Sequence, residues 1–504
     1  MKTRQLAKFV KYLLLVALSL AGAMPIVAEE KPVDGGRPLA VVRVNATTQA
    51  HDFFRPWGKK PPVSRRALGA VLSENRVLVA AELVANQNYV ELEKAASGEK
   101  VAATVAAVDY EANLAVLIPT NPKFLEGLGQ LDLSGPVKTG DHVDIWQLES
   151  SGTLVATEGL VTTTEVGRYV LDDYGFLLYR VTAAMQYREN SFSVPIVKDG
   201  KLAGLLMRFD PRSQSVDAIS QPVIEHFLKE AASKTPHGFP RAGLQYQPTR
   251  DPQLRRYLKL NGGAGDGGIY LSRVDAGTSA AKAGLQIGDV ILEVAGKKID
   301  ADGNYDDEDY GKISINHLIS TRHYTGDSLK VKFLRGGEIK ETTAIAADRP
   351  PQSFIIEPYV IDRAPKFVLL GGLIFQELNR QYLREWGNGW PKDAPLRFVY
   401  MDRYQAELFG PDRGKIVFLS QVLPAQSAIG YEQLAYLIVD KVNDKAIRGI
   451  ADLDEALKTP VNGFHKIEFT TDPRAIYLDA ATVVRDTQSV QKQYGLPVTS
   501  RLTE

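Results

Sequence analysis

The pattern of apolar positions from residue 39 to residue 228 predicts a β-rich domain. Short runs of aliphatic and β-branched residues recur between turn residues, for example at 40–44, 76–80 and 114–118. These runs lie close together with no helix-period segments between them, which is typical of a β-barrel or sandwich. The last element, 222–228, has apolar residues at helical spacing. We therefore expect a first domain over residues 39–232 that is built mainly of strands.

Two later blocks of the sequence share one pattern. A loop rich in Ser, Thr, Pro and Gly at 233–238 marks the boundary before them. Each block opens with a strand, continues with a helix-like segment and then has a strand led by glycine. This repetition predicts two copies of one α+β fold, the first over residues 239–348 and the second over residues 366–479. Residues 480–504 are expected to form a short polar C-terminal tail.

The first 28 residues have the layout of a Sec signal peptide. A basic region precedes the apolar run 12–20, and small residues follow at 21–23, with Ala28 as a second candidate cleavage position. The apolar run is too short to span a bilayer comfortably, and a retained N-terminal anchor is the alternative. We therefore expect an exported, periplasmic protein without a membrane span in the mature chain. The basic residues are Lys2, Arg4, Lys8 and Lys11.

Composition excludes several classes of function. The 504 residues include 60 Lys and Arg and 60 Asp and Glu, so the chain lacks the basic excess expected of a nucleic-acid binder. It contains no cysteine, which excludes disulfides, a thiolate nucleophile and thiolate metal sites. Seven histidines are spread over the whole chain. The sequence therefore predicts no cofactor and no metal site.

The second block carries a run of motifs that resembles a PDZ domain of the HtrA/Deg type. An alanine-rich helix and a Gly-Asp turn into a strand occupy residues 280–291, and an x-Gly-Lys turn follows at 294–299. The third block is more divergent, because residues 436–445 stand where the Gly-Asp turn and its strand would be. Its strand at 371–375 and residues 421–422 resemble the second PDZ domain of plant-type Deg proteases.

The resemblance implies a peptide-binding site. A PDZ domain binds an extended peptide as an added strand at a sheet edge, and backbone N–H groups hold the terminal carboxylate. Gly268 is expected to turn the backbone sharply and leave nearby amides free, with aliphatic side chains lining a pocket. The alternative is that these aliphatic residues are only core. Whether the third block binds peptide or mediates assembly stays open. The predicted site consists of Gly268, Ile269, Tyr270, Leu271, Ile315, Leu318 and Ile319.

The first domain resembles the trypsin-like domain of the HtrA/Deg family over most of residues 60–228. The expected fold is therefore a trypsin-like double β-barrel followed by two α+β PDZ domains, mainly β overall. The segments that carry the resemblance are 68–73, 77–84, 108–117, 190–197, 201–206 and 216–220.

Every position of the catalytic triad is substituted in this alignment. Glu82 stands at the histidine position, Asn113 at the aspartate position and Phe192 at the serine position. A serine protease needs an imidazole base, a carboxylate that orients it and a nucleophile. Ser191 and Ser193 are the remaining nucleophile candidates, but no histidine occurs between residues 51 and 142. The sequence therefore predicts a pseudoprotease domain without an intact catalytic site.

Three smaller features leave alternatives open. His142 follows Asp141 directly, and adjacent side chains on a strand point to opposite faces, so no dyad is expected. The acidic loop 300–306 spaces oxygen ligands as a calcium loop would, but lacks its glycine and glutamate positions, so a solvated loop is expected. The aromatic-rich insertion 375–409 fits either the core of the third block or a contact between subunits.

Two functions remain. The preferred one is an exported pseudoprotease that binds unfolded or C-terminally exposed polypeptides, as a chaperone, an adaptor or a regulatory partner of an active protease. The alternative is an active Deg-like serine endopeptidase in periplasmic protein quality control. The resemblance also implies a homo-oligomer or an assembly with an active Deg protease.

Overall fold

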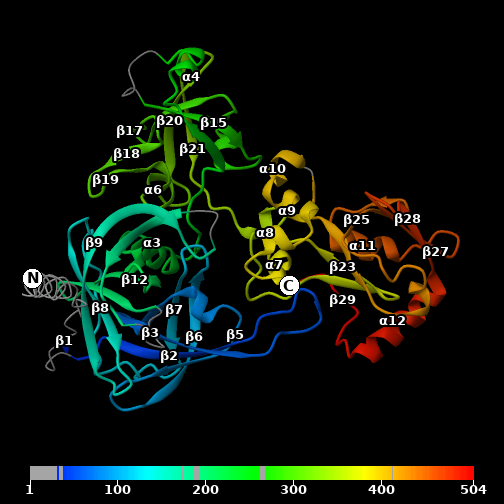
Figure 1. Ribbon diagram of the computed structural model, residues 1–504, viewed down its shortest axis with the longest axis horizontal. Coiled ribbons are helices and arrows are strands. Elements are labelled where there is room, and N and C mark those ends of the chain that lie inside the picture. The colour runs from blue at the N-terminus through cyan, green and yellow to red at the C-terminus, as the bar shows by residue number, and fades with distance from the viewer. Residues whose placement is uncertain are drawn as a thin grey trace, which may run out of the picture.

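The structure is a computed structural model that describes residues 31–32, 38–171, 175–186, 193–260, 267–410 and 413–503. The predictions made for the signal peptide at 1–28, for Ser191 and for Phe192 lie outside these residues. Figure 1 shows three bodies: a barrel domain, a second domain above it and a third domain to one side. The barrel domain holds the sequence up to α3, the second domain runs from residue 239 to residue 348, and the third follows.

Six strands close a first barrel, in the order β2-β3-β4-β7-β6-β5. In β2, every second side chain is buried, as Val42, Val44 and Ala46 show. A barrel wall requires this period of two, because alternate side chains face the interior. The short helix α2 (Ala81–Val84) follows β4 directly. The strands are β2 (Val41–Thr48), β3 (Val63–Leu72), β4 (Arg76–Val79), β5 (Gln87–Glu93), β6 (Lys100–Asp109) and β7 (Leu114–Pro119).

Six further strands form a second ring, because β8 pairs with both β11 and β9. The short strand β1 (Lys31–Pro32) pairs with β9 outside the ring, and α3 (Gln221–Ala231) follows the last strand. The predicted double β-barrel is therefore confirmed. The strands are β8 (His142–Leu148), β9 (Leu154–Arg168), β10 (Gly175–Thr182), β11 (Pro195–Lys198), β12 (Lys201–Asp210) and β13 (Ser215–Ser220).

The second domain is a sheet in the order β14-β15-β16-β20-β21, so β14 and β21 are its edges. The strands are β14 (Leu244–Pro248), β15 (Ile269–Val274), β16 (Val290–Val294), β17 (Lys297–Lys298), β18 (Asn304–Asp307), β19 (Gly311–Ser314), β20 (Ser328–Arg335) and β21 (Glu338–Ile345). The helices are α4 (Pro252–Tyr257), α5 (Ser279–Lys282) and α6 (Ile315–Ser320).

The third domain has the strand order β28-β27-β25-β24-β23-β22-β29. Its strands are β22 (Phe367–Leu370), β23 (Leu373–Glu377), β24 (Val417–Val422), β25 (Leu437–Val442), β26 (Lys445–Ala446), β27 (Phe464–Phe469), β28 (Ala475–Asp479) and β29 (Ser500–Arg501). The helices are α7 (Arg380–Leu383), α8 (Trp390–Asp393), α9 (Leu396–Arg403), α10 (Gln405–Leu408), α11 (Ile450–Leu457) and α12 (Ala480–Tyr494). The 3-10 turns are η1 (Pro351–Ser353), η2 (Arg384–Trp386) and η3 (Gln426–Ala428).

The expected polar tail after residue 479 is instead part of the third domain. The side chain of Asp479 caps α12 by accepting a hydrogen bond from the amide of Thr482 at 2.7 Å. Val483 and Val490 of this helix are buried, and β29 pairs with β22. The pattern was misread because so few apolar residues anchor the helix to the sheet.

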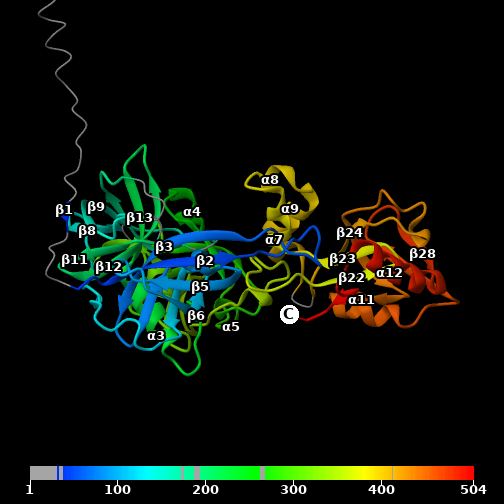
Figure 2. The ribbon, with the colours of Figure 1, turned by 90° about the horizontal axis from the view of Figure 1, so that it is seen from below.

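A loop of the first barrel reaches the third domain. Residues 49–62, between β2 and β3, run out from the barrel in Figures 1 and 2; we call them the β2–β3 arm. The ring of Phe54 meets Tyr382 and Trp386 edge-on, with centroids 5.5 and 4.8 Å away. Lys60 forms an ion pair of 2.7 Å with Glu385. The arm therefore joins the first barrel to the third domain through residues that lie far apart in the sequence.

Candidate functional site

The histidine and aspartate positions of the predicted triad come together in the structure. Glu82 lies in α2, and Asn113 lies in the turn between β6 and β7. The Asn113 side chain donates from Nδ2 to Oε1 of Glu82 at 3.2 Å and accepts at Oδ1 from the Glu82 amide at 2.9 Å. Asn113 has a φ of 55°, a conformation that asparagine adopts more readily than most residues. The geometry of the two positions is thus kept, while their chemistry is not.

Burial raises the pKa of the Glu82 carboxyl above its ordinary value. The hydrogen bond from Asn113 and the nearby Arg65 and Arg208 oppose this shift. Arg65 also donates from Nη1 to the backbone oxygen of Glu82 at 2.8 Å. The site therefore holds a half-buried carboxyl–amide pair where a serine protease has its imidazole and carboxylate.

Ser193 is buried, and its Oγ accepts a hydrogen bond from the amide of Ala80 at 2.8 Å. In the described part of the chain, no histidine ring hydrogen-bonds to Ser193 or to Glu82. His142 pairs with Glu158 at 2.8 Å and Asp141 with Lys198 at 2.6 Å, so these neighbours face different partners. Ser193 thus has no imidazole base, and its hydroxyl binds a backbone amide.

The prediction of a carboxylate nest at Gly268 is wrong. Gly268 has the positive φ expected of it, 112°, but its amide donates to the oxygen of Ile299 at 2.7 Å. The amide of Leu271 donates to Asp289 at 2.8 Å. The physical reason is that β15, which contains Ile269, Tyr270 and Leu271, pairs with β14 on one side and with β16 on the other. An interior strand has no free edge for a peptide.

β14 is one of the two edges of this sheet, and it lies beside an apolar cavity. On its other side β14 pairs with β15, and no other described strand pairs with it. Leu244 of β14 lines an apolar cavity of about 40 Å³ together with Ile269, Ile315 and Ile319. Three of the predicted pocket residues are therefore assembled around one cavity, between β14 and α6. Leu271 and Leu318 are also buried, but they do not line this cavity.

The turn before β14 presents free backbone amides beside this cavity. The oxygen of Ala242 accepts from the amide of Ala280, and the oxygen of Gly243 accepts from the amide of Asp275. Within the described residues, the amides of Ala242 and Gly243 have no acceptor. Gly243 has a φ of 70°, so the backbone turns sharply at this point. This turn was not predicted, although a glycine directly before the first apolar strand of the block indicates it in the sequence.

Arg241 ties this turn to the first barrel. Its guanidinium binds the carboxylate of Glu111, which also accepts a hydrogen bond from the hydroxyl of Tyr359 at 3.2 Å. Burial lowers the pKa of Arg241 to about 10. Glu111 lies two residues before Asn113. The start of the second domain is therefore held against the loop that carries Asn113.

In the described part of the third domain, the corresponding strand has no free edge. Its strand β23 pairs with β22 on one side and with β24 on the other. All four residues of β22 are buried, and β29 covers the outer side of β22. A peptide cannot add to β23 unless β22 leaves.

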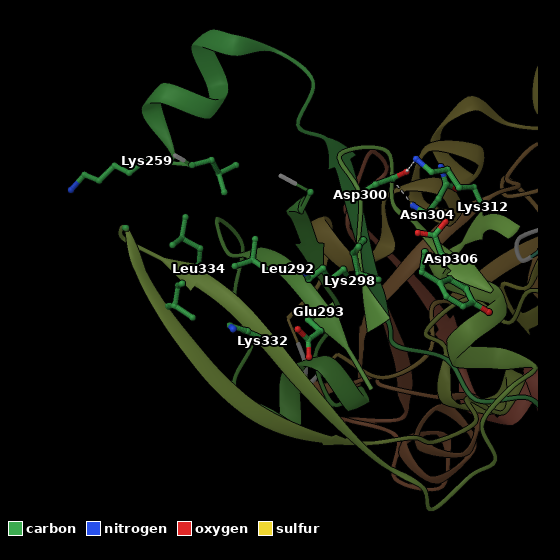
Figure 3. A pocket seen from close by; sticks show the side chains of 16 residues that line it. Lys259, Leu292, Glu293, Lys298, Asp300, Asn304, Asp306, Lys312, Lys332 and Leu334 are labelled. Atoms are coloured by element: carbon green, nitrogen blue, oxygen red, sulfur yellow. Dashed lines mark hydrogen bonds and ion pairs between the residues drawn. The ribbon is translucent and has the colours of Figure 1, made fainter. Parts of the chain in front are cut away.

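A wider depression of the second domain lies elsewhere, with a volume of about 570 Å³ (Figure 3). Figure 3 shows Lys259 and Leu334 at one end and Asp300 and Lys312 at the other. None of the seven predicted peptide-binding residues lines it. Asp300 accepts from the amides of Asp302 and Asn304 at 2.9 and 2.8 Å, so the acidic loop 300–306 is an internally bonded turn.

Comparison with known proteins finds two PDZ domain models and several protease relatives. A family model for a PDZ domain matches residues 356–500, and a second PDZ domain model matches residues 270–313. Protease Do-like 2, chloroplastic, of Arabidopsis thaliana is 26% identical over 465 residues, which cover 91% of this chain and 74% of the relative. Protease Do-like 4, mitochondrial, of the same plant is 25% identical and covers 83% of this chain and 77% of the relative.

The chain is a homologue of the Deg/HtrA proteases. Its first domain is a trypsin-like double barrel, and its second and third domains are PDZ domains. Among solved structures, the HtrA-type protease AlgW with decapeptide aligns with a TM-score of 0.47 at 20% identity, covering 62% of this chain and 97% of that chain. The serine endoprotease from Yersinia pestis aligns with a TM-score of 0.40 at 17% identity, covering 62% of this chain and 96% of that chain.

Two kinds of feature are absent from the described residues of this Deg/HtrA homologue. No helix in that part of the chain is long and apolar enough to cross a membrane. No group of three or more His, Asp or Glu side chains within it is placed to hold a metal ion.

Proposed function

We propose that this Deg/HtrA homologue is a non-proteolytic protein that holds the C-terminal residues of unfolded or exposed polypeptides in its second domain. The observation that carries the proposal is the free edge of β14, which lies beside the apolar cavity and the unbonded amides of Ala242 and Gly243. An extended peptide would add to β14 as a strand, and its terminal carboxylate would accept from these amides.

The cavity restricts the last side chain of the peptide. The cavity is small, about 40 Å³, and the side chains of Leu244, Ile269 and Ile315 that line it are aliphatic. It suits a small aliphatic group such as that of alanine or valine better than an aromatic ring. We therefore expect ligands that end in a small apolar residue with a free carboxylate.

A binding assay with the full-length mature chain tests this proposal. We expect a fluorescent decapeptide that ends in valine to bind, and the same peptide with a C-terminal amide or a terminal tryptophan to bind at least tenfold more weakly. Leu244→Arg places a charge at the cavity and should abolish binding. Ile339→Arg, a matched change at an exposed position on the opposite edge strand β21, should not. Equal binding of the acid and amide peptides would sink the proposal.

The absence of proteolysis is supported by the Glu82–Asn113 pair and by the hydrogen bond of Ser193 to Ala80. The alternative is an active Deg-like serine endopeptidase, which the names of the relatives favour. Reduced casein incubated with the mature chain should stay intact. Cleavage that disappears in Ser191→Ala or in Ser193→Ala would establish the endopeptidase instead.

We further propose that the protein acts after export, in the periplasm, as a chaperone, an adaptor or a regulatory partner. Assembly with copies of itself or with an active Deg protease would bring several peptide grooves together. Cell fractionation tests the location, and mass photometry of the purified chain, alone and with an active Deg protease, tests the assembly. A monomer in both mixtures would contradict the assembly.

A further inference from the structure

A buried histidine lies in the joint between the second barrel and the second domain. His226 of α3 is 1% exposed, and its ring lies between two aromatic rings. Phe239 stacks on it with centroids 4.3 Å apart, and Tyr324 with centroids 4.1 Å apart and planes 7° from parallel. Phe239 belongs to the segment that enters the second domain, and Tyr324 follows α6. The stack of three rings therefore spans both domains.

The hydrogen bonds of His226 show which form of the ring the joint accommodates. Nδ1 lies 3.1 Å from the backbone oxygen of Thr321, at the end of α6. A carbonyl oxygen only accepts, so Nδ1 carries the proton and Nε2 carries the lone pair of a neutral ring. Nε2 is buried and has no hydrogen-bond partner in the described structure. A second proton on Nε2 would therefore be a buried donor without an acceptor.

The charged groups around His226 do not offset the effect of burial on the pKa of its ring. Burial is the main cause that holds the pKa of His226 below its ordinary value, and Lys229 acts in the same direction. The Lys229 ammonium lies 4.0 Å from the centre of the Tyr324 ring, so this ring already makes a cation–π contact. Glu230 on the same helix and Asp327 beyond Tyr324 act in the opposite direction, as does the bond to Thr321. Phe176 of β10, on the barrel side, meets Phe239 edge-on with centroids 4.7 Å apart and extends the stack.

We propose that the second domain stays docked on the second barrel only while His226 is neutral, and that mild acid releases it. The undocked ring would be hydrated and would take a proton near pH 6.5, the ordinary value for histidine. The docked state binds fewer protons, so its stability relative to the undocked state is complete above about pH 6.5 and falls as the pH drops below it. The proposal concerns docking and does not require that the domain bind peptide.

Release would act on α6. The end of this helix is anchored to His226 through Thr321, and its residues Ile315 and Ile319 line the apolar cavity. A contact between the hydroxyls of Tyr179 in β10 and Tyr310 in the second domain, at 3.1 Å, also crosses the joint but does not titrate in this range. Loss of the histidine contact would free the C-terminal end of α6 from the second barrel, while the Arg241–Glu111 ion pair still tethers the start of the domain to the first barrel.

A second buried histidine titrates separately. His317 of α6 packs inside the second domain against Tyr305 and Tyr310, and burial with the nearby Arg322 lowers its pKa to about 4. Asp307, 3.8 Å from its Nε2, opposes that shift. His237 and His323 also belong to this region, where they pair with Asp348 at 3.8 Å and with Asp327 at 3.4 Å, so substitution of His226 itself is needed to separate its effect from theirs.

The lack of cysteine in the chain makes a distance measurement straightforward. Arg212→Cys in the β12–β13 turn and Gln286→Cys in the second domain are both exposed and can carry spin labels. We expect a narrow distance distribution at pH 7.5 and a longer, broader one at pH 5.0, with a midpoint below pH 6.5. Near-ultraviolet circular dichroism at both pH values checks that the domains stay folded.

Two variants isolate His226. His226→Phe keeps the ring stack, His226→Gln keeps a donor for Thr321, and neither titrates. Both variants should keep the narrow distribution of spin-label distances at pH 5.0, provided that they fold at pH 7.5. His142→Gln, an exposed histidine on β8, should respond like the wild type. An unchanged wild-type distribution at pH 5.0 would overturn the proposal, as would a full response in either non-titrating variant.

Discussion

Glu82 and Asn113 hold each other by two hydrogen bonds, one between their side chains at 3.2 Å and one from the Glu82 amide to the Asn113 side chain at 2.9 Å. An imidazole and a carboxylate make a comparable contact in a serine protease. In this chain the amide of Asn113 is the donor, and it is neutral. The pair therefore stabilises the loop after β4 without preparing a base.

We predict that Asn113→Asp destabilises the barrel domain at neutral pH. The substitution puts a second carboxylate next to Glu82, and two like charges at this separation cost roughly 1–4 kcal/mol at a partly exposed site. Their repulsion raises the pKa of one of them, so the folded state binds more protons than the unfolded state. The loss of unfolding free energy relative to the wild type should therefore shrink as the pH is lowered from 7.5 to 5.0. Urea unfolding at the two pH values measures it.

Asn88→Asp is the matched control for this measurement. Asn88 is exposed and bonds to the side chain of Gln49. We expect Asn88→Asp to change the free energy of unfolding by no more than about 0.5 kcal/mol, as for most surface substitutions. If Asn113→Asp behaves like Asn88→Asp at both pH values, the Glu82–Asn113 contact does not exist in solution.

Arg241→Ala should weaken the docking of the second domain on the first barrel. The change leaves the Glu111 carboxylate buried without its partner, which costs about 3–5 kcal/mol for a buried ion pair. The combined variant Arg241→Met with Glu111→Gln removes both charges and should recover most of this loss. Lys458→Ala, at an exposed pair with Glu455, should change little. Hydrogen exchange at residues 108–113 reports the docking, and equal exchange in all three variants would contradict the prediction.

Phe53→Ala should release the β2–β3 arm from the third domain. Phe53 is 2% exposed and lies in a core cluster with Tyr382 and Phe398 of that domain. Truncating a buried phenylalanine costs about 3–5 kcal/mol. We expect faster hydrogen exchange in the arm and in α7, while Val63→Ala, at an exposed position beside the arm, leaves exchange unchanged. Unchanged exchange in Phe53→Ala would mean that the arm does not dock.

Two valines of α12 test whether the C-terminal segment belongs to the third domain. Val490 is 1% exposed and Val484 is 59% exposed on the same helix. Val490→Asp buries an unpaired charge and should unfold the helix from the sheet, with a loss of several kcal/mol. Val484→Asp should be tolerated within about 0.5 kcal/mol. Thermal unfolding of the two variants compares them directly, and equal melting temperatures would restore the tail interpretation.

Much of the fold could be predicted because local patterns specify it. The alternation in strands such as β2 and the Gly-Asp turn before β16 are local signals, and the structure has both elements in place. Contacts between distant segments carry no such signal. Nothing near Phe54 in the sequence indicates that its ring meets Trp386. The sparse valines of α12 likewise gave too weak a period to distinguish a docked helix from a polar tail.

The candidate site was predicted in part for a related reason. The contact between Glu82 and Asn113 follows from the alignment of two motifs, and the structure brings them together. The prediction of a carboxylate nest at Gly268 failed because the sequence of a strand does not show whether neighbouring strands pair with one side of it or with both. Ile269 lines the same cavity as Ile315 and Ile319. An apolar side chain can reach this cavity from an interior strand as well as from an edge strand.

The covalent continuity of β22 with β23 has a kinetic consequence for the third domain. The two strands are joined by a turn at Gly371 and Gly372, so β22 can return to its place after each opening without diffusing through the solution. A tethered segment with so short a connection competes at an effective concentration in the millimolar range. A free peptide of micromolar affinity, present at micromolar concentration, would lose that competition almost every time. Selectivity between the two PDZ domains would then reflect local concentration, before any difference in side-chain recognition.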